Sequence, residues 1–538
     1  MSSTGRVRHR WVLLWAGVLA LCSAPAPAQT VPPGYRIETF ASGLDAPCAF
    51  DFMPDGGVLF TEQNTGRVRL LRAGGGVQAT PVLSVAGVAG GGERGLLGIA
   101  FDRGYPNRPF VFVLHSATTP SRTRISRYTL NAAAYAGGAD LIADPATRFD
   151  LLDAIPDAAG NHNGGTLRFA SDGSLIASLG DDAFPCGAQD STGLRGVILR
   201  MQVNRLGPGP GVASIGQLTP LDNPYASSPD SNARLVLARG LRNPFRVQCD
   251  PVLPWLYIGD VGENLREELD LLALSSVGTL MPGMARPGAN FGWPYLEGTA
   301  VGAHANECAA APDSLVAPAY DYDRTSQQFG AAIIPAGYVF AVVTLATAIQ
   351  PQPGLPPGMY LSDYYSGALT RLDVLPGASQ WQVAPPVSGQ PSAGHFGEGF
   401  AEISDWRVDG QSLWFVRQSQ GFAAHSGSIG RLSAVPLPPP PPPQPSPLAL
   451  AVLATPAVGG AGFRLSADNS LPGALTIHGL DGRVIRRWSN EEFQRFPEGL
   501  RVNWDGRDTA GRKVRPGLYV ARLESGGRTA SVRVMFLR

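Results

Sequence analysis

Apolar and polar positions along most of this chain follow a pattern of short paired segments. An apolar run leads into a turn that contains Asp or Gly, and a second apolar run follows, as in DFMPDGGVLFTE. This pattern is typical of a β-hairpin, because tight turns favour Asp and Gly between two strands. Helical periodicity is sparse. The hairpin pattern recurs in AFDFMPDGGVLFTEQNTGRVRLL, LLGIAFDRGYPNRPFVFVLHS, TLRFASDGSLIASLGD, FRVQCDPVLPWLYIGDVG, GMYLSDYYSGALTRLDV and DWRVDGQSLWFVRQ with GSIGRLSAV.

Six such units with irregular insertions between them predict an all-β fold, a six-bladed β-propeller over residues 29–434. A β-sandwich is the alternative architecture, but this length without a linker is long for one sandwich. The many glycines (66) and prolines (48) suit short strands joined by tight turns. In a propeller the loops of all blades meet at one mouth of a central channel, so the ends of the inner strands are where functional residues are expected.

A proline-rich run, PLPPPPPPQPSP, marks a boundary after the predicted propeller. Such a run forms a stiff spacer, which predicts a linker over residues 435–447 and a separate module over 448–538. That module is also β, with a hairpin around Asp481-Gly482. Its WDGRD and GLYVARL segments resemble the immunoglobulin-like domain of flagellar hook-cap proteins and of secreted-protease tails. The resemblance implies an Ig-like β-sandwich with a scaffold or attachment role, and tethering to a surface or envelope is one form that this role can take.

The first residues have the three parts of an export signal. GRVRHR is basic, WVLLWAGVLALC is apolar and APAPAQT offers a small-residue cleavage site. We expect a signal peptide over residues 1–28, cleaved after Ala28. A lipoprotein signal through Cys22 is the alternative, but the bulky Leu21 before it argues against that reading. No other apolar run reaches membrane-spanning length, so the expected location is periplasmic or secreted.

Export changes how the cysteines are interpreted. Four remain after cleavage, and an even number in an oxidising compartment predicts two disulfides with three possible pairings. The chain has no CxxC pair, which argues against a zinc site. The four are Cys48, Cys186, Cys249 and Cys308.

The charge balance excludes some classes of partner. Lys plus Arg (43) equal Asp plus Glu (43), so the formal net charge is zero. Without a basic excess or an acidic tail, a nucleic-acid partner is not expected.

Five segments place polar side chains beside glycines at the ends of predicted strands. Each also has an ordinary explanation. A loop histidine is more often a turn residue than a catalyst. Arg242-Asn243-Pro244 suits a plain turn and Trp293 suits a core. The segments are GGGERGLLGIAFD with Glu93 and Arg94, GNHNGGTLRF with Asn161, His162 and Asn163, ARGLRNPFR with Arg242 and Asn243, IGDVGENLREELDLL with Asp260, Gly262, Glu263, Glu267 and Glu268, and GANFGWPYLEG with Asn290, Trp293 and Glu297.

In this order the segments closely resemble the family of pyrroloquinoline quinone (PQQ)-dependent soluble glucose, aldose sugar and sorbosone dehydrogenases. The resemblance is good over residues 34–300 and weak over 300–434. It implies an exported six-bladed propeller that binds PQQ and calcium and oxidises an aldose at its anomeric carbon. The calcium polarises the quinone as a Lewis acid, and a histidine takes the proton of the anomeric hydroxyl.

The resemblance also implies individual roles for residues of this chain. The histidine falls on His162, which becomes the expected general base. Arg242 and Asn243 match the family's RNP element, where the arginine stabilises charge on the quinone. The calcium-binding carbonyls fall on Gly262 and Glu263. Further substrate- or cofactor-binding positions fall on Glu93, Asn161 and Trp293.

The chain departs from the family pattern in several places. Asn161 stands where an Asp often precedes the histidine, which removes a carboxylate that would orient the base. Two basic positions expected to clamp the PQQ carboxylates correspond to AGYVFAVV, without a cation, and to Tyr365-Ser366, with Arg371 several residues on. Arg324 is a candidate replacement. Cys48 and Cys249 lie on strands of neighbouring type, so a disulfide between them is one possibility.

Two further functions stay open. The first is a non-catalytic propeller of the Hedgehog-interacting-protein type, which the missing cations and the Ig-like tail favour. The second is a calcium-dependent sugar lactonase, for which Glu93, Asp181 and Asp260 would supply carboxylate ligands. The identity of the sugar, the electron acceptor and the oligomeric state are not determined by the sequence.

Overall fold

The computed structural model describes residues 28–250, 253–276, 280–312, 314–324, 343–346, 354–373, 381–409, 412–421, 423–435, 448–467, 473–496, 499–525 and 528–537. The chain forms two compact units that divide after Val435. The predicted signal peptide up to residue 27 and the proline-rich run 436–447 lie outside the described residues.

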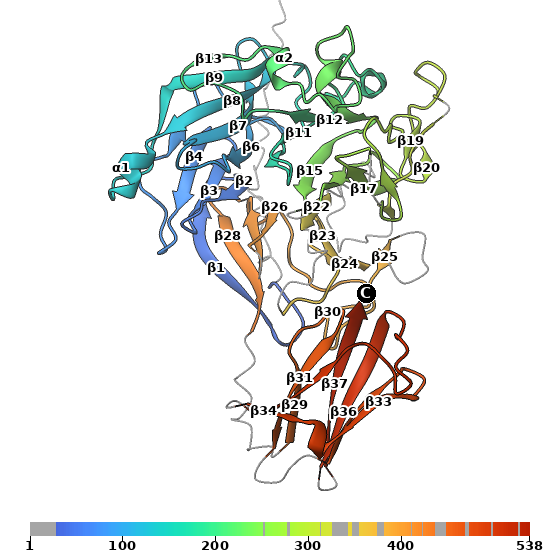
Figure 1. Ribbon diagram of the computed structural model, residues 1–538. Helices are drawn as coiled ribbons and strands as arrows, with labels where there is room; N and C mark the ends of the chain where they lie inside the picture. Colours follow the sequence, from blue (N-terminus) through green and yellow to red (C-terminus); the bar gives the residue numbers. More distant parts are fainter. Residues whose placement is uncertain are drawn as a thin grey trace, which may run out of the picture. The chain divides into compact units, whose positions relative to one another are not determined.

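The first unit is built from six antiparallel-based sheets, which are the blades of the expected propeller (Figure 1). In each blade the three innermost strands follow one another along the chain from the inside to the outside. Blade 1 contains β2 (Pro47–Phe52), β3 (Val58–Glu62), β4 (Arg67–Leu71) and β5 (Leu83–Ser84); blade 2 contains β6 (Leu96–Phe101), β7 (Phe110–Ala117), β8 (Arg122–Leu130), β9 (Ala143–Ile155) and β13 (Gly211–Val212); blade 3 contains β10 (Leu167–Phe169), β11 (Leu175–Leu179), β12 (Val197–Met201) and β14 (Val236–Arg239).

The other three blades complete the ring. Blade 4 contains β15 (Pro244–Cys249), β16 (Trp255–Asp260), β17 (Arg266–Ala273), β18 (Met284–Ala285) and β21 (Tyr320–Asp323); blade 5 contains β22 (Val343–Ala346), β23 (Met359–Asp363), β24 (Leu369–Asp373) and β25 (Gln382–Val383); blade 6 contains β26 (Ile403–Val408), β27 (Ser412–Arg417), β28 (Gly427–Ala434) and β1 (Tyr35–Leu44). Short elements lie between them: β19 (Leu296–Glu297), β20 (Ala300–Val301), the helices α1 (Ala132–Ala136) and α2 (Ile215–Leu218), and the 3₁₀ helices η1 (Pro185–Gln189) and η2 (Ala233–Leu235).

The blades pack face to face, which explains why many strands are apolar on both sides. All residues of β6 and β7 are buried, for example. Six hydrophobic clusters lie between successive blades around the ring, and the last joins blade 6 to blade 1. Between blades 2 and 3 the rings of Phe112 and Phe169 meet edge to face at 5.5 Å. Burial of both faces of each sheet therefore holds the ring together.

The two ends of the unit meet in one sheet. β1 pairs with β28 in antiparallel register, from Tyr35 opposite Ala434 to Leu44 opposite Gly427. Figure 1 shows this blue strand beside the orange strands of blade 6. The inner strands also contact one another in sequence from β2 to β26, and β26 contacts β2. The propeller is thus closed by hydrogen bonds between its first and last strands.

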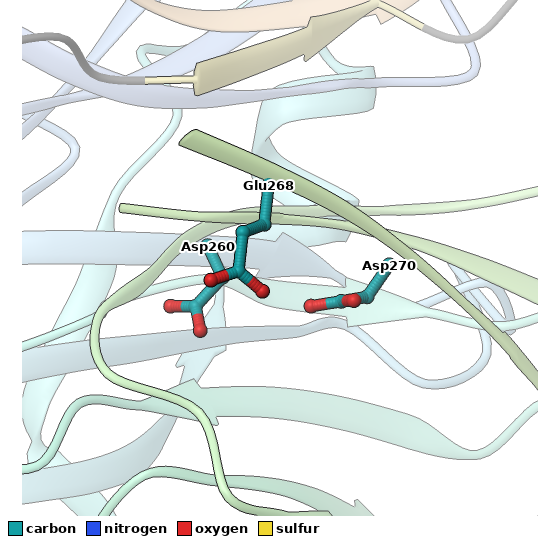
Figure 2. Close-up of side chains that lie close together, drawn as sticks. All are labelled: Asp260, Glu268 and Asp270. Carbon is teal, nitrogen blue, oxygen red and sulfur yellow. The ribbon is translucent and has the colours of Figure 1, made fainter. Parts of the chain in front are cut away.

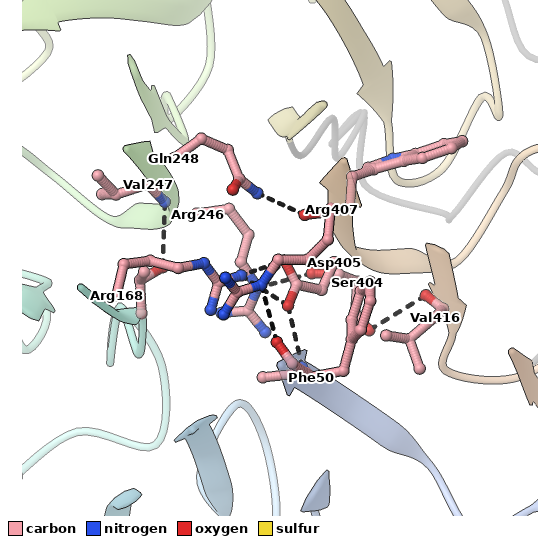
Figure 3. Close-up of polar contacts among 12 residues, drawn as sticks. Phe50, Arg168, Arg246, Val247, Gln248, Ser404, Asp405, Arg407 and Val416 are labelled. Carbon is pink, nitrogen blue, oxygen red and sulfur yellow. Dashed lines mark hydrogen bonds and ion pairs between the residues drawn. The ribbon is translucent and has the colours of Figure 1, made fainter. Parts of the chain in front are cut away.

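A buried ion cluster crosses the channel between the inner strands (Figure 3). The two carboxylate oxygens of Asp405 on β26 accept hydrogen bonds from Nη2 of Arg168 on β10, at 2.6 and 2.7 Å. The same carboxylate accepts from the backbone N–H of Phe50 on β2 at 3.1 Å. Arg246 on β15 lies 4.0 Å from the same carboxylate and donates to the carbonyl of Ser404 at 2.7 Å. One carboxylate therefore connects the inner strands of four blades.

The second unit is a β-sandwich of two sheets that share one core. The core contains Phe463, Trp504, Tyr519 and Phe536. The predicted hairpin around Asp481-Gly482 joins β32 to β33. The sheets are β29 (Leu448–Val452), β31 (Ala461–Ala467), β35 (Gly499–Trp504) and β34 (Gln494–Phe496), and β30 (Ala457–Val458), β37 (Arg528–Leu537), β36 (Gly517–Ser525), β32 (Ala474–His478) and β33 (Val484–Ser489), with the 3₁₀ helix η3 (Asn490–Glu492) after β33.

Candidate active site

A cavity of about 650 Å³ opens at the end of the channel where the inner strands begin. Loops from all six blades line it, as expected for the mouth of a propeller. The lining residues are Asp45, Ala46, Cys48, Gln63, Asn64, Gly92, Glu93, Leu97, Asn161, Gly164, Asn243, Phe245, Arg246, Tyr364, Tyr365, Gln418, Ser419, Ala423, Ala424 and His425.

His162 lies beside this cavity in a fixed orientation. Its Nδ1 is 2.7 Å from Oδ1 of Asp181, which is fully buried. A carboxylate at Nδ1 favours the tautomer with the proton on Nδ1, which leaves Nε2 with a free lone pair. The side chain of His162 keeps 12% of its surface exposed. The arrangement is that of an imidazole ready to accept a proton at Nε2.

Asp181 is itself held by two further donors. The indole Nε1 of Trp293 donates to its Oδ2 at 2.8 Å, and the N–H of Ala183 donates to its Oδ1 at 2.9 Å. The carboxylate that orients His162 therefore comes from position 181, not from the position before the histidine. The expectation that Asn161 deprives the histidine of its carboxylate is wrong. Asn161 is exposed and lines the cavity.

The backbone around His162 depends on close approaches that only glycine permits. His162 has a φ of 58°, in the left-handed region. Its carbonyl oxygen lies so near Gly180 that a Cβ atom there would be 2.0 Å away. Glycine at position 180 thus lets the end of β11 pass directly under the histidine loop.

Glu93 connects the loops of three blades. Its Oε2 accepts from the N–H of His162 at 2.8 Å and from Nδ2 of Asn243 at 3.0 Å. The Oδ1 of Asn243 in turn accepts from the N–H of Gly164 at 3.0 Å. Both side chains line the cavity. Glu93 and Asn243 therefore fix the position of the His162 loop and also present polar atoms to any ligand.

Arg242 lies next to these groups. Its guanidinium is 5.5 Å from the centre of the Trp293 ring, and Nη1 donates to the carbonyl of Val261 at 3.1 Å. Its Nε is buried without a hydrogen-bond partner. Asp260 accepts from the backbone N–H groups of Arg242 and Asn243 at 2.9 and 2.7 Å. The sequence-predicted residues His162, Arg242, Asn243, Glu93 and Trp293 are thus brought together.

The loop predicted to bind calcium has its polar groups committed. The carbonyl of Gly262 accepts a hydrogen bond from Nη1 of Arg324. The backbone N–H groups of residues 263–266 all donate to Oε1 of Glu297, at 2.7 to 3.1 Å. The side chain of Glu263 pairs with His304. Of the two carbonyls predicted to bind calcium, the one at Gly262 is therefore already bound to a cationic side chain.

Three buried carboxylates lie close together behind the site: Asp260, Glu268 and Asp270 (Figure 2). One oxygen of each lies within 4.8 Å of the others, and both oxygens of Asp270 lack a hydrogen-bond partner. Burial raises the pKa of Asp260 to about 7, although hydrogen bonds from the backbone of Arg242 and Asn243 lower it. Burial and the neighbouring carboxylates raise the pKa of Glu268 and Asp270 well above the usual range. Sequence reasoning missed Asp270, and an oxygen-binding cation could be held here.

The sequence predicts that two clamp cations are missing, and the structure describes one of these positions, at Tyr365-Ser366. Arg371 donates to the carbonyl of Pro357 at 2.7 Å, away from the cavity. Tyr365 lines the cavity, and its N–H donates to Asp363 at 3.0 Å. The AGYVFAVV segment lies outside the described residues apart from Val343.

The cysteines form one disulfide among the described residues, between Cys186 and Cys308. Cys48 and Cys249 are free, so the pairing considered for them is wrong. Cys48 is near the start of β2 and lines the cavity, whereas Cys249 ends β15 and lines a depression at the other end of the channel. All inner strands run in the same direction, from one mouth of the channel to the other. A cysteine near the start of one inner strand and a cysteine at the end of another therefore lie about a strand length apart.

No helix in the described part of the chain is long and apolar enough to cross a membrane. Residues 44–343 match the model of the glucose/sorbosone dehydrogenase family, and the chain belongs to this family.

Two relatives and one solved structure illustrate the similarity. The aldose sugar dehydrogenase YliI of Escherichia coli is 24% identical over 53% of this chain and 68% of its own length. The quinoprotein glucose dehydrogenase B of Acinetobacter calcoaceticus is 26% identical over 54% of this chain and 59% of its own. The PQQ-bound aldose sugar dehydrogenase of Streptomyces coelicolor has 22% identity and a TM-score of 0.51, and it covers 75% of this chain and 99% of its own. This structural likeness shows the fold.

Proposed function

We propose that the propeller is a PQQ-dependent dehydrogenase that oxidises an aldose, or a similar sugar, at its anomeric carbon. The observation that carries the proposal is the His162–Asp181 pair at 2.7 Å beside a cavity lined from every blade. Membership of the glucose/sorbosone dehydrogenase family supports the same substrate class.

The cavity suits a flat, polar cofactor in size and in chemistry. Its volume is about 650 Å³, and Tyr364 and Tyr365 give it aromatic surface. Arg242, with its buried and unpartnered Nε, and the amide of Asn243 are the groups that would hold the quinone. When bound, PQQ supplies a two-electron oxidant that takes the hydride of the sugar.

The chain itself supplies proton transfer and orientation. Nε2 of His162 accepts the proton of the anomeric hydroxyl, since Nδ1 is committed to Asp181. The carboxylate of Asp181 stabilises the positive charge that the imidazole then carries. Glu93 lines the cavity and offers a hydrogen-bond acceptor to sugar hydroxyls.

The calcium expected from the family resemblance does not fit at Gly262, because Arg324 already donates to that carbonyl. No step of the proposed reaction is therefore assigned to a metal ion.

The test is a titration of the purified protein with PQQ, followed by a panel of aldoses with an artificial electron acceptor. We expect stoichiometric binding and sugar-dependent dye reduction that falls by about a hundredfold or more in His162→Ala. Absence of PQQ binding in the intact protein would refute the proposal.

A non-catalytic binding module is the second candidate, and one observation favours it. The arginine and the histidine in the described cavity wall already have partners: Arg246 donates to backbone carbonyls, and His425 lies 2.7 Å from Asp45. The PQQ titration separates the two functions, because a binding module without a quinone site would leave the PQQ spectrum unchanged.

We further propose that the chain is exported and that its sandwich domain tethers it to a surface. The Cys186–Cys308 disulfide suits an oxidising compartment, as the predicted signal peptide does. Fractionation of cells that express the full chain, with mass analysis of the mature N-terminus, tests cleavage after Ala28 and the final location. Removal of residues 448–538 should then release the propeller from the envelope fraction.

A further inference from the structure

Arg324, considered above as a replacement for a clamp cation, lies at the loop of Gly262. It follows β21, and its backbone N–H donates to the carbonyl of Leu265 at 3.0 Å. Its side chain is 3% exposed and lies 3.1 Å from Oε1 of Glu267, which is fully buried. The same guanidinium donates to the carbonyl of Gly262. A single buried guanidinium therefore contacts both the carbonyl of Gly262 and the carboxyl group of Glu267.

The neighbouring carbonyl is also taken by a guanidinium. Val261 accepts from Nη1 of Arg242 at 3.1 Å, so two consecutive carbonyls of the loop bind two arginines. The other oxygen of Glu267 accepts from the N–H of Gly262 at 3.3 Å. Calcium needs six to eight oxygen ligands, with about 2.3–2.6 Å to each. It would have to displace both arginines from carbonyls that hydrogen bonds already hold in place.

The loop is rigid on its other side as well. Four successive N–H groups, from residues 263–266, converge on Oε1 of Glu297, which belongs to β19. Only glycine fits at position 262, because a Cβ atom there would lie 1.6 Å from the carbonyl oxygen of Arg266. Carbonyls in this loop are thus presented in a fixed direction, and Arg324 meets the one at Gly262.

We propose that Arg324 replaces calcium as the fixed cation of the cofactor site, so that this chain binds its quinone without a metal ion at Gly262. The proposal rests on the proposed function for the identity of the cofactor. A guanidinium keeps its charge at all relevant pH values and supplies several directed donors. It can therefore stabilise negative charge beside the cofactor at a position where relatives would need a bound ion.

The first experiment compares PQQ binding, followed by absorbance, in excess EDTA and in excess CaCl₂. The wild-type protein should bind PQQ with the same affinity in both. Arg324→Met should bind about tenfold more weakly or worse in EDTA and should recover in CaCl₂. Arg266→Met is the matched control, since Arg266 stands at the end of the same loop but its side chain pairs with Asp321 at 3.7 Å. It should behave like the wild type.

A second experiment measures calcium without PQQ. The carboxylates of Asp260, Glu268 and Asp270 form a second candidate site for calcium. The two proteins compared, with and without Arg324→Met, therefore both carry Asp270→Asn, which removes that second site. Equilibrium dialysis against Ca²⁺ should show one more ion per chain when Arg324→Met is added. If Arg324→Met does not fold, as judged by its melting temperature, Arg324→Gln takes its place in both experiments.

The outcomes separate the inference from the proposed function. If wild-type affinity for PQQ collapses in EDTA and returns with Ca²⁺, the inference is wrong and the proposed function stands. If PQQ binds under neither condition, the proposed function is wrong, and the dialysis decides the inference alone. Equal calcium stoichiometry with and without Arg324 would overturn it.

Discussion

Nδ1 of His162 lies 2.7 Å from Oδ1 of Asp181, because both residues stand at the open end of the antiparallel hairpin that β10 and β11 form in blade 3. This relationship predicts that Asp181→Asn lowers kcat by about a hundredfold to ten-thousandfold, because an amide cannot favour the same tautomer or stabilise the imidazolium. Steady-state kinetics with an aldose and an artificial acceptor measure the effect. Asp182→Asn is the control, since that carboxylate contacts Ala159 and Arg195 instead. Equal losses in the two variants would contradict the assignment.

Trp293 should matter through its N–H group. Trp293→Phe keeps the aromatic packing but removes the hydrogen bond to Asp181, so we expect kcat to fall by about tenfold with little change in KM. Kinetics over a range of pH should show the loss at all pH values where the wild type is active. An unchanged kcat would mean that the backbone donor at Ala183 holds Asp181 by itself.

His115 should make the protein sensitive to acid. It is buried in blade 2 with both ring nitrogens unpartnered, and burial, with Arg124 and Arg148 nearby, lowers its pKa from 6.5 to about 4. Between pH 6.5 and pH 4 the unfolded chain therefore binds more protons at His115 than the folded protein does. The contribution of neutral His115 to the free energy of unfolding is complete above pH 6.5 and is lost as the pH falls towards 4. The loss is about 3 kcal/mol in total. Denaturant unfolding of wild type and His115→Leu at pH 7 and pH 5 measures it.

In that comparison the variant should lose less stability than the wild type between the two pH values. Parallel losses would show that carboxylates elsewhere account for the acid sensitivity and that His115 does not titrate in this range.

The Cys186–Cys308 disulfide should stabilise the site against heat. It closes a loop of 122 residues between blade 3 and the segment that carries His304. Its removal by Cys186→Ser with Cys308→Ser should cost about 2–5 kcal/mol. A melting temperature that falls by several degrees in the variant, and equally in wild type under reducing conditions, is the expected result. The double variant should not respond to reductant.

Asp405 should be essential for the stability of the channel. Asp405→Asn leaves Arg168 and Arg246 buried without their shared carboxylate, for which we expect a loss of about 3–5 kcal/mol. Chemical denaturation measures the change. Asp409→Asn on the loop after β26 serves as a control, and its effect should be much smaller. A small effect of Asp405→Asn would show that water enters the channel and screens the arginines.

Local patterns in the sequence were enough to predict the blades. Apolar segments on either side of Asp- and Gly-containing turns predict the hairpins. Because His162, Asn243 and Glu93 each precede an inner strand, the propeller fold predicts that they lie near one another. Contacts between distant segments left no such signal. Arg324 reaches Gly262 from a different strand of blade 4, and Cys186 pairs with Cys308 across 122 residues. These contacts depend on how turns bring side chains together, which periodicity does not specify.

The pairing of β1 with β28 has a consequence for biosynthesis. Residues 35–44 are made before the rest of the propeller, but their partner strand ends at residue 434, near the end of the propeller. During synthesis the ring therefore stays open, with an exposed strand edge at each end, until almost the whole unit has been made. A ribosome that stalls anywhere before blade 6 releases a chain that cannot close, however well its earlier blades have formed.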